Sequence, residues 1–290
     1  MRTARTEGRE QGLIVSMDGR LVRGGRAAVS IEDWGFRYGW GAFETIRVSQ
    51  RKPVFLQRHL DRFAQNARAL LLWDGDESTW WRDAILRALP HAVSREGILN
   101  LYWTRGEAPL FRGRRIICLR PQLPRRRGNG RVWVAPWRIG PGVPGMGAKT
   151  LAYLPYAFSS ICAQAAEFAD AVLVNRHGRI ADGASASVFL IDKGRLFTPP
   201  LTEGALPGIT RGVVLELAEE LGIHARMVPL PVARLHASDG VFLTSALRGL
   251  RAVKHVDDHK VPMSPEAKRV FDRLTKTYIR VVARDLAAFR

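Results

Sequence analysis

Lysine is scarce in this 290-residue chain, and one of its seven lysines stands apart from the others. Six lie in polar turns or charged segments, whereas Lys149 follows a Gly- and Pro-rich stretch and precedes small, apolar and aromatic residues at 150–155. Such surroundings are expected to shield the amine from water, which lowers its pKa and makes it nucleophilic. Schiff-base chemistry requires an amine of this kind. On this stretch alone, a solvated lysine at a loop-to-helix junction is the more common interpretation.

Two other segments combine a turn with backbone groups that suit an anion. Residues 206–211 form a glycine-containing turn that leads into a predicted helix, whose first N–H groups are free to bind a phosphate. The turn after the apolar strand at 241–244 offers a second cradle around Ser245 and Ala246. Arg62, on a predicted helix, carries a guanidinium that suits a phosphate. A plain helix cap, a turn and a solvated helix face are the alternative interpretations.

A nucleophilic amine combined with phosphate cradles predicts pyridoxal phosphate as the cofactor. This cofactor needs a carboxylate that keeps its pyridine nitrogen protonated, because the charged ring then acts as an electron sink. Asp182, between two predicted strands and followed by a Gly/Ala/Ser run, is the candidate, with an ordinary turn aspartate as the alternative. His255 and His259 are four residues apart without a third ligand, so no metal site is predicted.

The composition narrows the class of protein. With 46% hydrophobic and 25% charged residues, the chain is long enough for two globular domains. No apolar run approaches the ~20 residues of a membrane span, and two cysteines do not make a disulfide framework, so we expect a protein of the reducing cytoplasm. The net charge of +18 is spread along the chain without a nucleic-acid-binding motif. Specific nucleic-acid binding is therefore not expected, although such a field also attracts anionic small molecules.

The hydrophobic pattern predicts an α+β architecture that must position these residues. Helices are expected at residues 57–72, 78–89, 154–168, 208–221 and 264–289, and strands at 13–22 (a hairpin), 27–31, 43–48, 98–104, 115–119, 131–139, 171–174, 187–191, 196–198, 241–244 and 250–256. Gly35, Gly39 and Gly41, interleaved with aromatic residues, indicate a backbone that passes close to another segment. The predicted division is an N-terminal domain at 12–120, a Pro/Gly/Arg-rich linker at 121–130 and a C-terminal domain at 131–290.

Several segments, in this order and spacing, resemble the class IV (fold-type IV) pyridoxal-phosphate aminotransferase family. They are Asp33–Thr45, His59–Phe63, Lys149–Leu154, Asp182–Phe189 and Leu206–Arg211. The family includes branched-chain aminotransferases, D-amino-acid aminotransferases and 4-amino-4-deoxychorismate lyases. The resemblance implies a mixed α/β fold with a small N-terminal α/β domain, a larger C-terminal domain with a β-barrel-like core, and the cofactor in the cleft between them. It also implies a homodimer whose sites are completed across the interface.

The resemblance assigns roles to individual residues. Lys149 would be the catalytic residue that holds the cofactor and moves protons, and Asp182 would face the ring nitrogen where the family usually has the longer Glu. The cofactor phosphate would be held by Arg62, by the Ile209 and Thr210 amides with the Thr210 hydroxyl, and by the backbone of Ser245 and Ala246. Ala152, Ser187 and Ala246 also depart from the residues that are common in the family.

The reaction depends on how the substrate carboxylate is held. Leu110 and Arg112 stand where D-amino-acid enzymes have Arg and His, whereas Thr244–Arg251 looks more like the lyase members. The preferred hypothesis is a lyase that converts 4-amino-4-deoxychorismate to 4-aminobenzoate and pyruvate. The expected substrate-binding residues are Tyr38, Arg105, Arg112 and Arg248. The alternatives are an amino-acid aminotransferase of branched-chain or D-amino-acid type and a basic, nucleic-acid-associated relative without cofactor.

Overall fold

The computed structural model describes residues 13–23, 26–72, 77–121, 130–140 and 147–289. The chain forms two compact units: unit 1 comprises Met1–Pro124, Ala148–Tyr153 and Arg284–Arg290, and unit 2 comprises Arg125–Gly147 and Leu154–Ala283. Most of the expected linker, residues 122–129, lies outside the described residues. The segment around Lys149, which the sequence division placed in the C-terminal domain, belongs to unit 1 because its backbone bonds to a strand of that unit.

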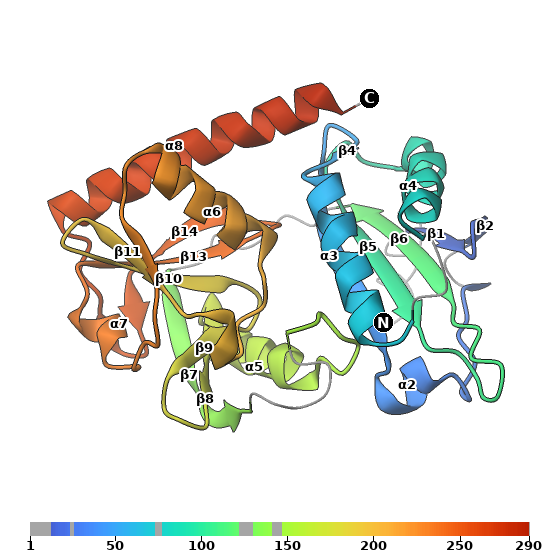
Figure 1. Cartoon of the computed structure of the whole chain (residues 1–290), viewed down its shortest axis with the longest axis horizontal. Helices are drawn as coiled ribbons and strands as arrows, with labels where there is room; N and C mark the ends of the chain where they lie inside the picture. Colours follow the sequence, from blue (N-terminus) through green and yellow to red (C-terminus); the bar gives the residue numbers. More distant parts are fainter. Residues whose placement is uncertain (1–12, 24–25, 73–76, 122–129, 141–146, 290) are drawn as a thin grey trace, which may run out of the picture. The chain divides into compact units, whose positions relative to one another are not determined.

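Unit 1 is built on one six-stranded antiparallel sheet with the order β2-β1-β6-β5-β3-β4 (Figure 1). Its strands are β1 (Ile14–Met17), β2 (Arg20–Arg23), β3 (Gly41–Ser49), β4 (Lys52–Pro53), β5 (Gly97–Thr104) and β6 (Arg115–Pro121). Its helices are α2 (Trp34–Tyr38), α3 (Leu56–Ala69), α4 (Glu77–Ala88) and the short 3-10 helix η2 (Leu89–His91). Helices α3 and α4 cover one face of this sheet.

The core of unit 1 follows from two periodicities. On α3, Leu60, Phe63 and Ala67 recur every three to four residues and are buried, as the predicted amphipathic helix requires. On β3, Ile46 and Val48 alternate with side chains on the opposite face, because successive strand residues point to opposite sides. The face of β3 that carries Ile46 and Val48 therefore packs against α3, and the opposite face contacts other segments.

The segment that carries Lys149 runs along β3 as an added piece of strand. The Phe43 N–H donates to the Lys149 carbonyl, and the Leu151 N–H donates to the Gly41 carbonyl, both at 2.9 Å. A Cβ on Gly41 would lie 2.5 Å from the Leu151 side chain, and one on Gly39 would lie 2.8 Å from the backbone of Ala152. The predicted close approach at these glycines is confirmed.

Unit 2 contains two five-stranded sheets, with the orders β12-β11-β10-β13-β14 and β16-β15-β7-β8-β9. The strands are β7 (Arg131–Ile139), β8 (Asp170–Asn175), β9 (Ile180–Gly183), β10 (Ser187–Asp192), β11 (Arg195–Thr198), β12 (Ala225–Met227), β13 (Gly240–Ser245), β14 (Gly249–Val253), β15 (His255–Val256) and β16 (His259–Lys260). Strands β8 and β10 are buried along almost their whole length, so both faces of these strands are covered.

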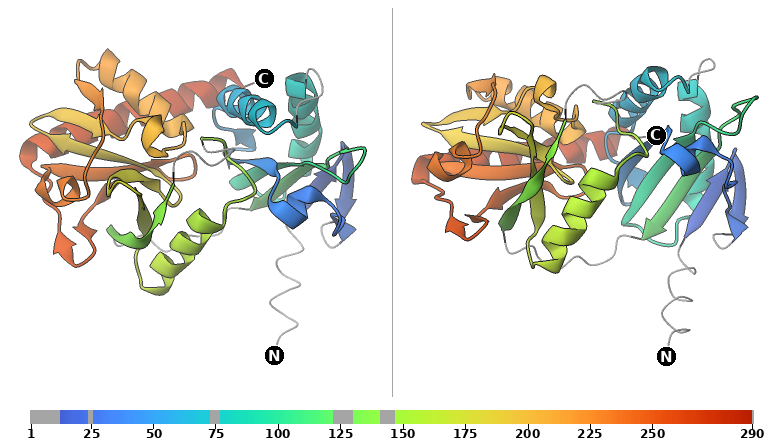
Figure 2. Two further views of the ribbon diagram at one scale, coloured as in Figure 1. Left: turned by 60° about the horizontal axis from the view of Figure 1, so that its bottom comes forward. Right: turned by 90° about the horizontal axis from the view of Figure 1, so that it is seen from below.

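The helices of unit 2 pack on these sheets. They are α5 (Leu154–Ala165), the 3-10 helix η3 (Leu201–Glu203), α6 (Ile209–Glu220), α7 (Arg234–Ala237) and α8 (Pro265–Ala288), the last of which ends in unit 1. Figure 2 shows α5 alongside β7 and β8. Phe271 of α8 packs edge-on against Phe242 of β13, whose ring is stacked on Phe189 of β10 at 5.0 Å. Among the described residues, no helix is long and apolar enough to cross a membrane.

Most predicted elements are present, and the exceptions have physical reasons. Residues 27–31 do not form the predicted strand; they lie largely exposed, with Ile31 72% accessible, so no partner strand covers their apolar side chains. Strand β9 was not predicted, because four residues that include Asp182 and Gly183 carry little strand signal. The last predicted strand, 250–256, divides into β14 and β15 at Lys254.

Candidate active site

The Lys149 amine lies over an aromatic surface in unit 1. Its Nζ is 4.0 Å from the centre of the Phe43 ring and 4.8 Å from that of Tyr153, and these two rings meet edge to face at 4.9 Å. Phe43 is in turn stacked on Tyr102 of β5. Aromatic faces attract a cationic amine, and rigid rings limit the directions in which the side chain can extend. The amine is therefore held at a defined place, as a catalytic lysine needs to be.

On the opposite face of β3, Glu44 is fully buried and fully paired. Arg62 of α3 donates from Nε to Glu44 Oε1 at 2.7 Å and from Nη2 to Oε2 at 2.8 Å, and His59 Nδ1 lies 2.9 Å from Oε2. Two parallel bonds of this kind are the strong bidentate form of the Arg–carboxylate pair. Arg62, predicted to hold the cofactor phosphate, is thus first a partner of Glu44; its phosphate role stays a prediction.

The electrostatics of this cluster are set by burial and by Arg62. Burial alone would raise the pKa of Glu44, but Arg62 and His59 together hold it well below its usual range. Burial lowers the pKa of His59, although Glu44 works in the opposite direction. Glu44 is therefore ionised and His59 neutral near pH 7, so the pair Glu44–Arg62 carries no net charge.

In unit 2, Asp182 of β9 is a buried carboxylate, and only one of its two oxygens accepts a hydrogen bond. Its Oδ2 accepts a hydrogen bond from the Leu206 N–H at 3.0 Å, whereas its buried Oδ1 has no partner among the described residues. Burial raises the pKa of Asp182 to about 7, against the lowering effect of the backbone donors and of Arg211. Buried polar atoms in native proteins are nearly always bonded, so an orphan of this kind indicates a missing ligand.

Three further buried polar atoms near the start of α6 share this property. Thr210 Oγ1, Arg211 Nε and Thr244 Oγ1 are buried and unpartnered among the described residues. Helix α6 begins at Ile209, so its first N–H groups lack intrahelical acceptors. A Cβ on Gly208 would lie 2.9 Å from Ser187 Oγ, so the predicted turn needs glycine to enter the helix beside β10.

These groups fit pyridoxal phosphate. A phosphate would satisfy the free amides and the Thr210 hydroxyl at the start of α6, and a protonated ring nitrogen would satisfy Asp182 Oδ1. Lys149, in unit 1, bears an amine of the kind that this cofactor requires, and its role in holding the cofactor stays a prediction. Ser245 and Ala246, the second predicted cradle, are half-buried at the turn between β13 and β14.

Three of the predicted substrate residues, Tyr38, Arg105 and Arg112, belong to unit 1, and Arg248 belongs to unit 2. Tyr38 is 58% exposed and packs against Trp34. Arg105 is engaged structurally: it donates to the Leu71 carbonyl at 2.9 Å and lies over the rings of Trp40 and Phe111. In the same loop region, Arg112 is exposed. Arg248, in unit 2, donates to the Ala169 carbonyl at 3.3 Å. The substrate roles of these four residues stay predictions.

Sequence reasoning did not assign roles to three residues that surround the predicted ones. Glu44 fixes Arg62, and Tyr102 and Tyr153 complete the aromatic surface around Phe43 and Lys149. A signal for Glu44 was present, because a carboxylate among buried strand positions needs a cationic partner. The aromatic surface depends on strand pairing, in which Phe43 lies opposite Tyr102, and no local pattern gives that pairing.

Comparison with known proteins identifies the class. Residues 41–256 match the amino-transferase class IV family, so the chain belongs to that family. It is 29% identical over 252 residues to a Methanocaldococcus jannaschii protein named as a branched-chain-amino-acid aminotransferase, with 84% of this chain and 88% of that protein covered. It is 26% identical to the Mycobacterium tuberculosis bifunctional aminodeoxychorismate lyase / D-amino acid transaminase, with 92% and 99% covered.

The solved structures give the same fold. The branched-chain aminotransferase of Thermoproteus uzoniensis superposes with a TM-score of 0.83 at 23% identity, covering 93% of this chain and 95% of that one. The predicted fold class, a mixed α/β fold-type IV architecture, is confirmed. The chain is an enzyme of a family that works with pyridoxal phosphate, as the sequence predicted.

Proposed function

We propose that this enzyme is a pyridoxal-phosphate-dependent lyase that converts 4-amino-4-deoxychorismate, or a close relative of it, to 4-aminobenzoate and pyruvate. When bound, the cofactor supplies an electron sink for the carbon that bears the substrate amine. Asp182 keeps the ring nitrogen protonated, and the start of α6 with Thr210 holds the phosphate. Lys149 Nζ takes the proton from the amine-bearing carbon, and the enolpyruvyl group leaves with the electrons of its bond and is protonated to pyruvate.

The observation that carries the choice of a lyase is the polarity of the sheet face beside Lys149. Strand alternation puts Thr45 on the same face as Phe43, and Asn100 lies opposite Thr45 and donates to its hydroxyl at 2.9 Å. Arg120 of β6 extends this face and interacts with the Tyr102 hydroxyl. A dicarboxylate that bears an amine suits these polar and cationic groups beside the aromatic surface.

A second candidate function is transamination of an amino acid. The similarity to the Methanocaldococcus jannaschii protein favours it, and the Mycobacterium tuberculosis relative is named for both activities. One scaffold of this kind hosts several chemistries, so the substrate must be decided by the site and by assay. The two reactions differ in the reactants that they need. A lyase releases pyruvate without an amino acceptor, whereas an aminotransferase turns over only when a 2-oxo acid is supplied.

The experiment compares the two reactions on one preparation. Purified enzyme is loaded with pyridoxal phosphate and given 4-amino-4-deoxychorismate, and pyruvate and 4-aminobenzoate are measured without any oxo acid. In parallel, leucine, valine and D-alanine are each assayed with 2-oxoglutarate or pyruvate. We expect pyruvate and 4-aminobenzoate in equal amounts, and none with Lys149→Ala. Steady transamination without pyruvate release from the first substrate would replace the lyase by the second candidate.

The proposal includes a homodimer in solution. It is supported by an exposed apolar stripe on α5, where Leu154, Phe158 and Ile161 are 74%, 51% and 63% accessible at positions i, i+4 and i+7. Exposed apolar surface of this kind is typical of protein–protein contacts. Light scattering on the eluted protein should give twice the chain mass of 32.4 kDa. A mass of one chain at micromolar concentration would contradict a stable dimer.

A further inference from the structure

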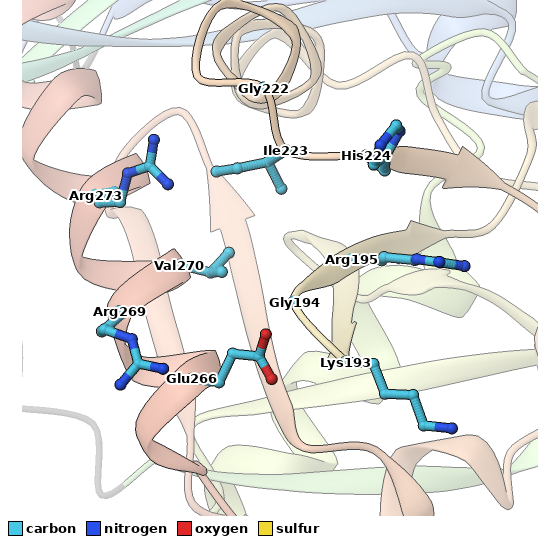
Figure 3. Close-up of a pocket in the computed structure, with 10 residues that line it drawn as sticks. All are labelled: Lys193, Gly194, Arg195, Gly222, Ile223, His224, Glu266, Arg269, Val270 and Arg273. Carbon is cyan, nitrogen blue, oxygen red and sulfur yellow. The ribbon is translucent and has the colours of Figure 1, made fainter.

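Cations that lie near one another do not always form a binding site, and unit 2 gives an example. A pocket of about 370 Å³ lies between the β10–β11 turn, the end of α6 and the first half of α8 (Figure 3). The side chains of Lys193 and Arg195 extend away from α8, and Arg273 donates to the Leu221 carbonyl at 3.0 Å. These cations therefore offer no common point to an anion.

The face of the unit 1 sheet that carries Phe43 is different, because its side chains form three ordered rows across β3, β5 and β6. Residues that pair in a sheet point to the same side, and so do alternate residues along a strand. Starting from Lys149, the rows are aromatic, polar and cationic. They consist of Phe43, Tyr102 and Ile116; of Thr45, Asn100 and Cys118; and of Arg47, Ile98 and Arg120. Successive rows are two residues apart along each strand, which is about 7 Å.

The two cations of the third row differ in their partners. Arg47 Nη2 lies 3.7 Å from Glu96 Oε2, so its charge is shared with a carboxylate. Arg120 is exposed, and no carboxylate contacts it among the described residues. Arg120 can therefore bind an anion without first losing an ion pair.

Arg120 extends toward the aromatic row. Burial raises the pKa of the Tyr102 hydroxyl and of the Cys118 thiol, and the guanidinium of Arg120, which hydrogen-bonds to both side chains, acts against each rise. The backbones of the first and third rows are about 14 Å apart along the strands, so a guanidinium that meets Tyr102 must cross the polar row. The charge of Arg120 therefore lies over the polar row and next to the aromatic one.

Lys149 and Arg120 reach over this face from opposite sides. The Lys149 segment bonds to the edge of β3 that faces away from β5, so three strand spacings, roughly 14 Å, separate the two backbones across the sheet. Lys149 Nζ lies 4.0 Å from the centre of the Phe43 ring, and Arg120 meets the Tyr102 hydroxyl. Between the amine and the guanidinium lie the stacked rings of Phe43 and Tyr102, an apolar surface that suits a flat six-membered ring.

We infer that Arg120 binds the ring carboxylate of the substrate and thereby selects amines that carry a carboxylate on the far side of a six-membered ring. The inference rests on the proposed lyase function. In 4-amino-4-deoxychorismate the ring carboxylate lies opposite the amine, and it is retained in 4-aminobenzoate. An α-amino acid has its carboxylate on the carbon that bears the amine, too close to Lys149 to meet Arg120. Arg120 is thus a specificity-determining residue that takes no part in proton transfer.

The test uses the enzyme saturated with pyridoxal phosphate and measures binding of 4-aminobenzoate and of 4-aminobenzamide, which has a similar shape but no charge. We expect the wild type to bind the acid more tightly than the amide. Arg120→Gln should raise the Kd of the acid about tenfold, the lower end of the range for a hydrogen bond to a charged group, because Arg120 is exposed to water. The Kd of the amide should not change. Arg120→Lys keeps the charge and should recover part of the loss.

Arg87→Gln is the matched control. It removes the charge of an exposed arginine on α4, a helix that covers the other face of the same sheet, and it should change neither Kd. In turnover of 4-amino-4-deoxychorismate, Arg120→Gln should raise KM about tenfold with little change in kcat, because the ring carboxylate is held equally before and during the reaction. All variants are first checked for an unchanged thermal midpoint and circular dichroism spectrum.

Three binding results would overturn the inference: a wild type that binds the acid no more tightly than the amide, an unchanged Kd of the acid in Arg120→Gln, or an equal loss in Arg87→Gln. Pyruvate release with an unchanged KM in Arg120→Gln would keep the proposed reaction and overturn the role of Arg120. Binding of the acid that depends on Arg120, in an enzyme that releases no pyruvate, would remove the proposed reaction and leave the carboxylate site standing.

Discussion

Two of the buried carboxylates, Glu44 in unit 1 and Asp182 in unit 2, are in opposite states. Glu44 in unit 1 has both oxygens bonded to Arg62 and His59, and its pKa is held well below the usual range. Asp182 in unit 2 has one oxygen bonded to the Leu206 amide and one orphaned, and burial raises its pKa to about 7. Both oxygens of Glu44 have hydrogen-bond partners in unit 1, whereas one oxygen of Asp182 has no partner among the described residues.

The difference separates scaffold from binding site. A buried ion pair whose members satisfy one another fixes the positions of β3 and α3 but offers little to a ligand. A buried carboxylate with a free oxygen is costly until a donor arrives, and a bound ligand can supply that donor. Asp182, Thr210 and Thr244 carry this cost in unit 2, and buried side-chain nitrogens of Asn66 and Trp81 in unit 1 are also unpartnered among the described residues.

The largest effect expected from this comparison is the loss of unfolding free energy when Glu44 is substituted. Glu44→Gln leaves the Arg62 guanidinium, 11% accessible, without its anion, and breaking one side of a buried pair costs about 3–5 kcal/mol. Urea unfolding should show this loss equally in cofactor-free and cofactor-loaded protein. The exposed pair Arg37–Glu32 is the control, and Glu32→Gln should change the unfolding free energy by less than about 0.5 kcal/mol. A small effect at Glu44 would mean that the cluster is not the scaffold we infer.

The next effect is the pH dependence at Asp182. Its folded pKa of about 7 lies above the usual value of 3.8, so its contribution to stability is complete below about pH 4 and is lost as pH rises through 7. The unfolding free energy of cofactor-free Asp182→Asn, taken relative to that of the wild type, should therefore rise by about 2 kcal/mol between pH 5 and pH 7. His59, whose pKa is lowered, acts in the opposite direction over this range, but it is present in both proteins and cancels in the difference.

Urea unfolding of the two cofactor-free proteins at pH 5, 6 and 7 measures this gain. Cofactor binding should change the sign of the comparison at pH 7, because the ring nitrogen needs the carboxylate that the variant lacks. A difference between wild type and variant that is constant with pH would show that Asp182 is charged throughout, and that its second oxygen has a partner.

The smallest effect is at the phosphate cradle. Thr210→Val removes a buried hydroxyl that has no partner, so the cofactor-free protein should keep its stability while the cofactor Kd rises about tenfold, the effect of one hydrogen bond. Thr198→Val is the matched control, because Thr198 Oγ1 is buried but donates to the Val188 carbonyl at 2.8 Å. It should lose about 1 kcal/mol of stability with little change in Kd. The reverse pattern in the two variants would contradict the assignment of the cradle.

The sequence predicted those parts of the site that depend on local pattern. Lys149, Asp182 and the turn into α6 could be found because each lies in a short segment with its own glycine or loop signal. The pairing of Glu44 with Arg62 depends on how α3 packs on β3, 18 positions away, and the stacking of Phe43 on Tyr102 depends on strand register. Such contacts come from tertiary packing, which local propensity does not determine.

The arginines predicted to bind the substrate also show that local sequence does not determine side-chain contacts. The sequence made Arg105, Arg112 and Arg248 candidates for a substrate carboxylate because they lie in the segments 104–112 and 244–251, and it could not rank them in an arginine-rich chain. The structure separates them: Arg105 is packed between aromatic rings and a backbone carbonyl, whereas Arg112 is exposed. Side-chain partners distinguish an anchoring arginine from one that is available to a ligand.

The central claim is that Lys149 carries pyridoxal phosphate. The most direct measurement is the absorption spectrum of the loaded protein from ~300 to 500 nm before and after borohydride, followed by peptide mass spectrometry. We predict a cofactor band that borohydride bleaches, and a phosphopyridoxyl mass on Lys149 but on none of the other six lysines. Lys149→Ala should show neither the band nor the adduct. An adduct on another lysine, or an unchanged band in Lys149→Ala, would contradict the account.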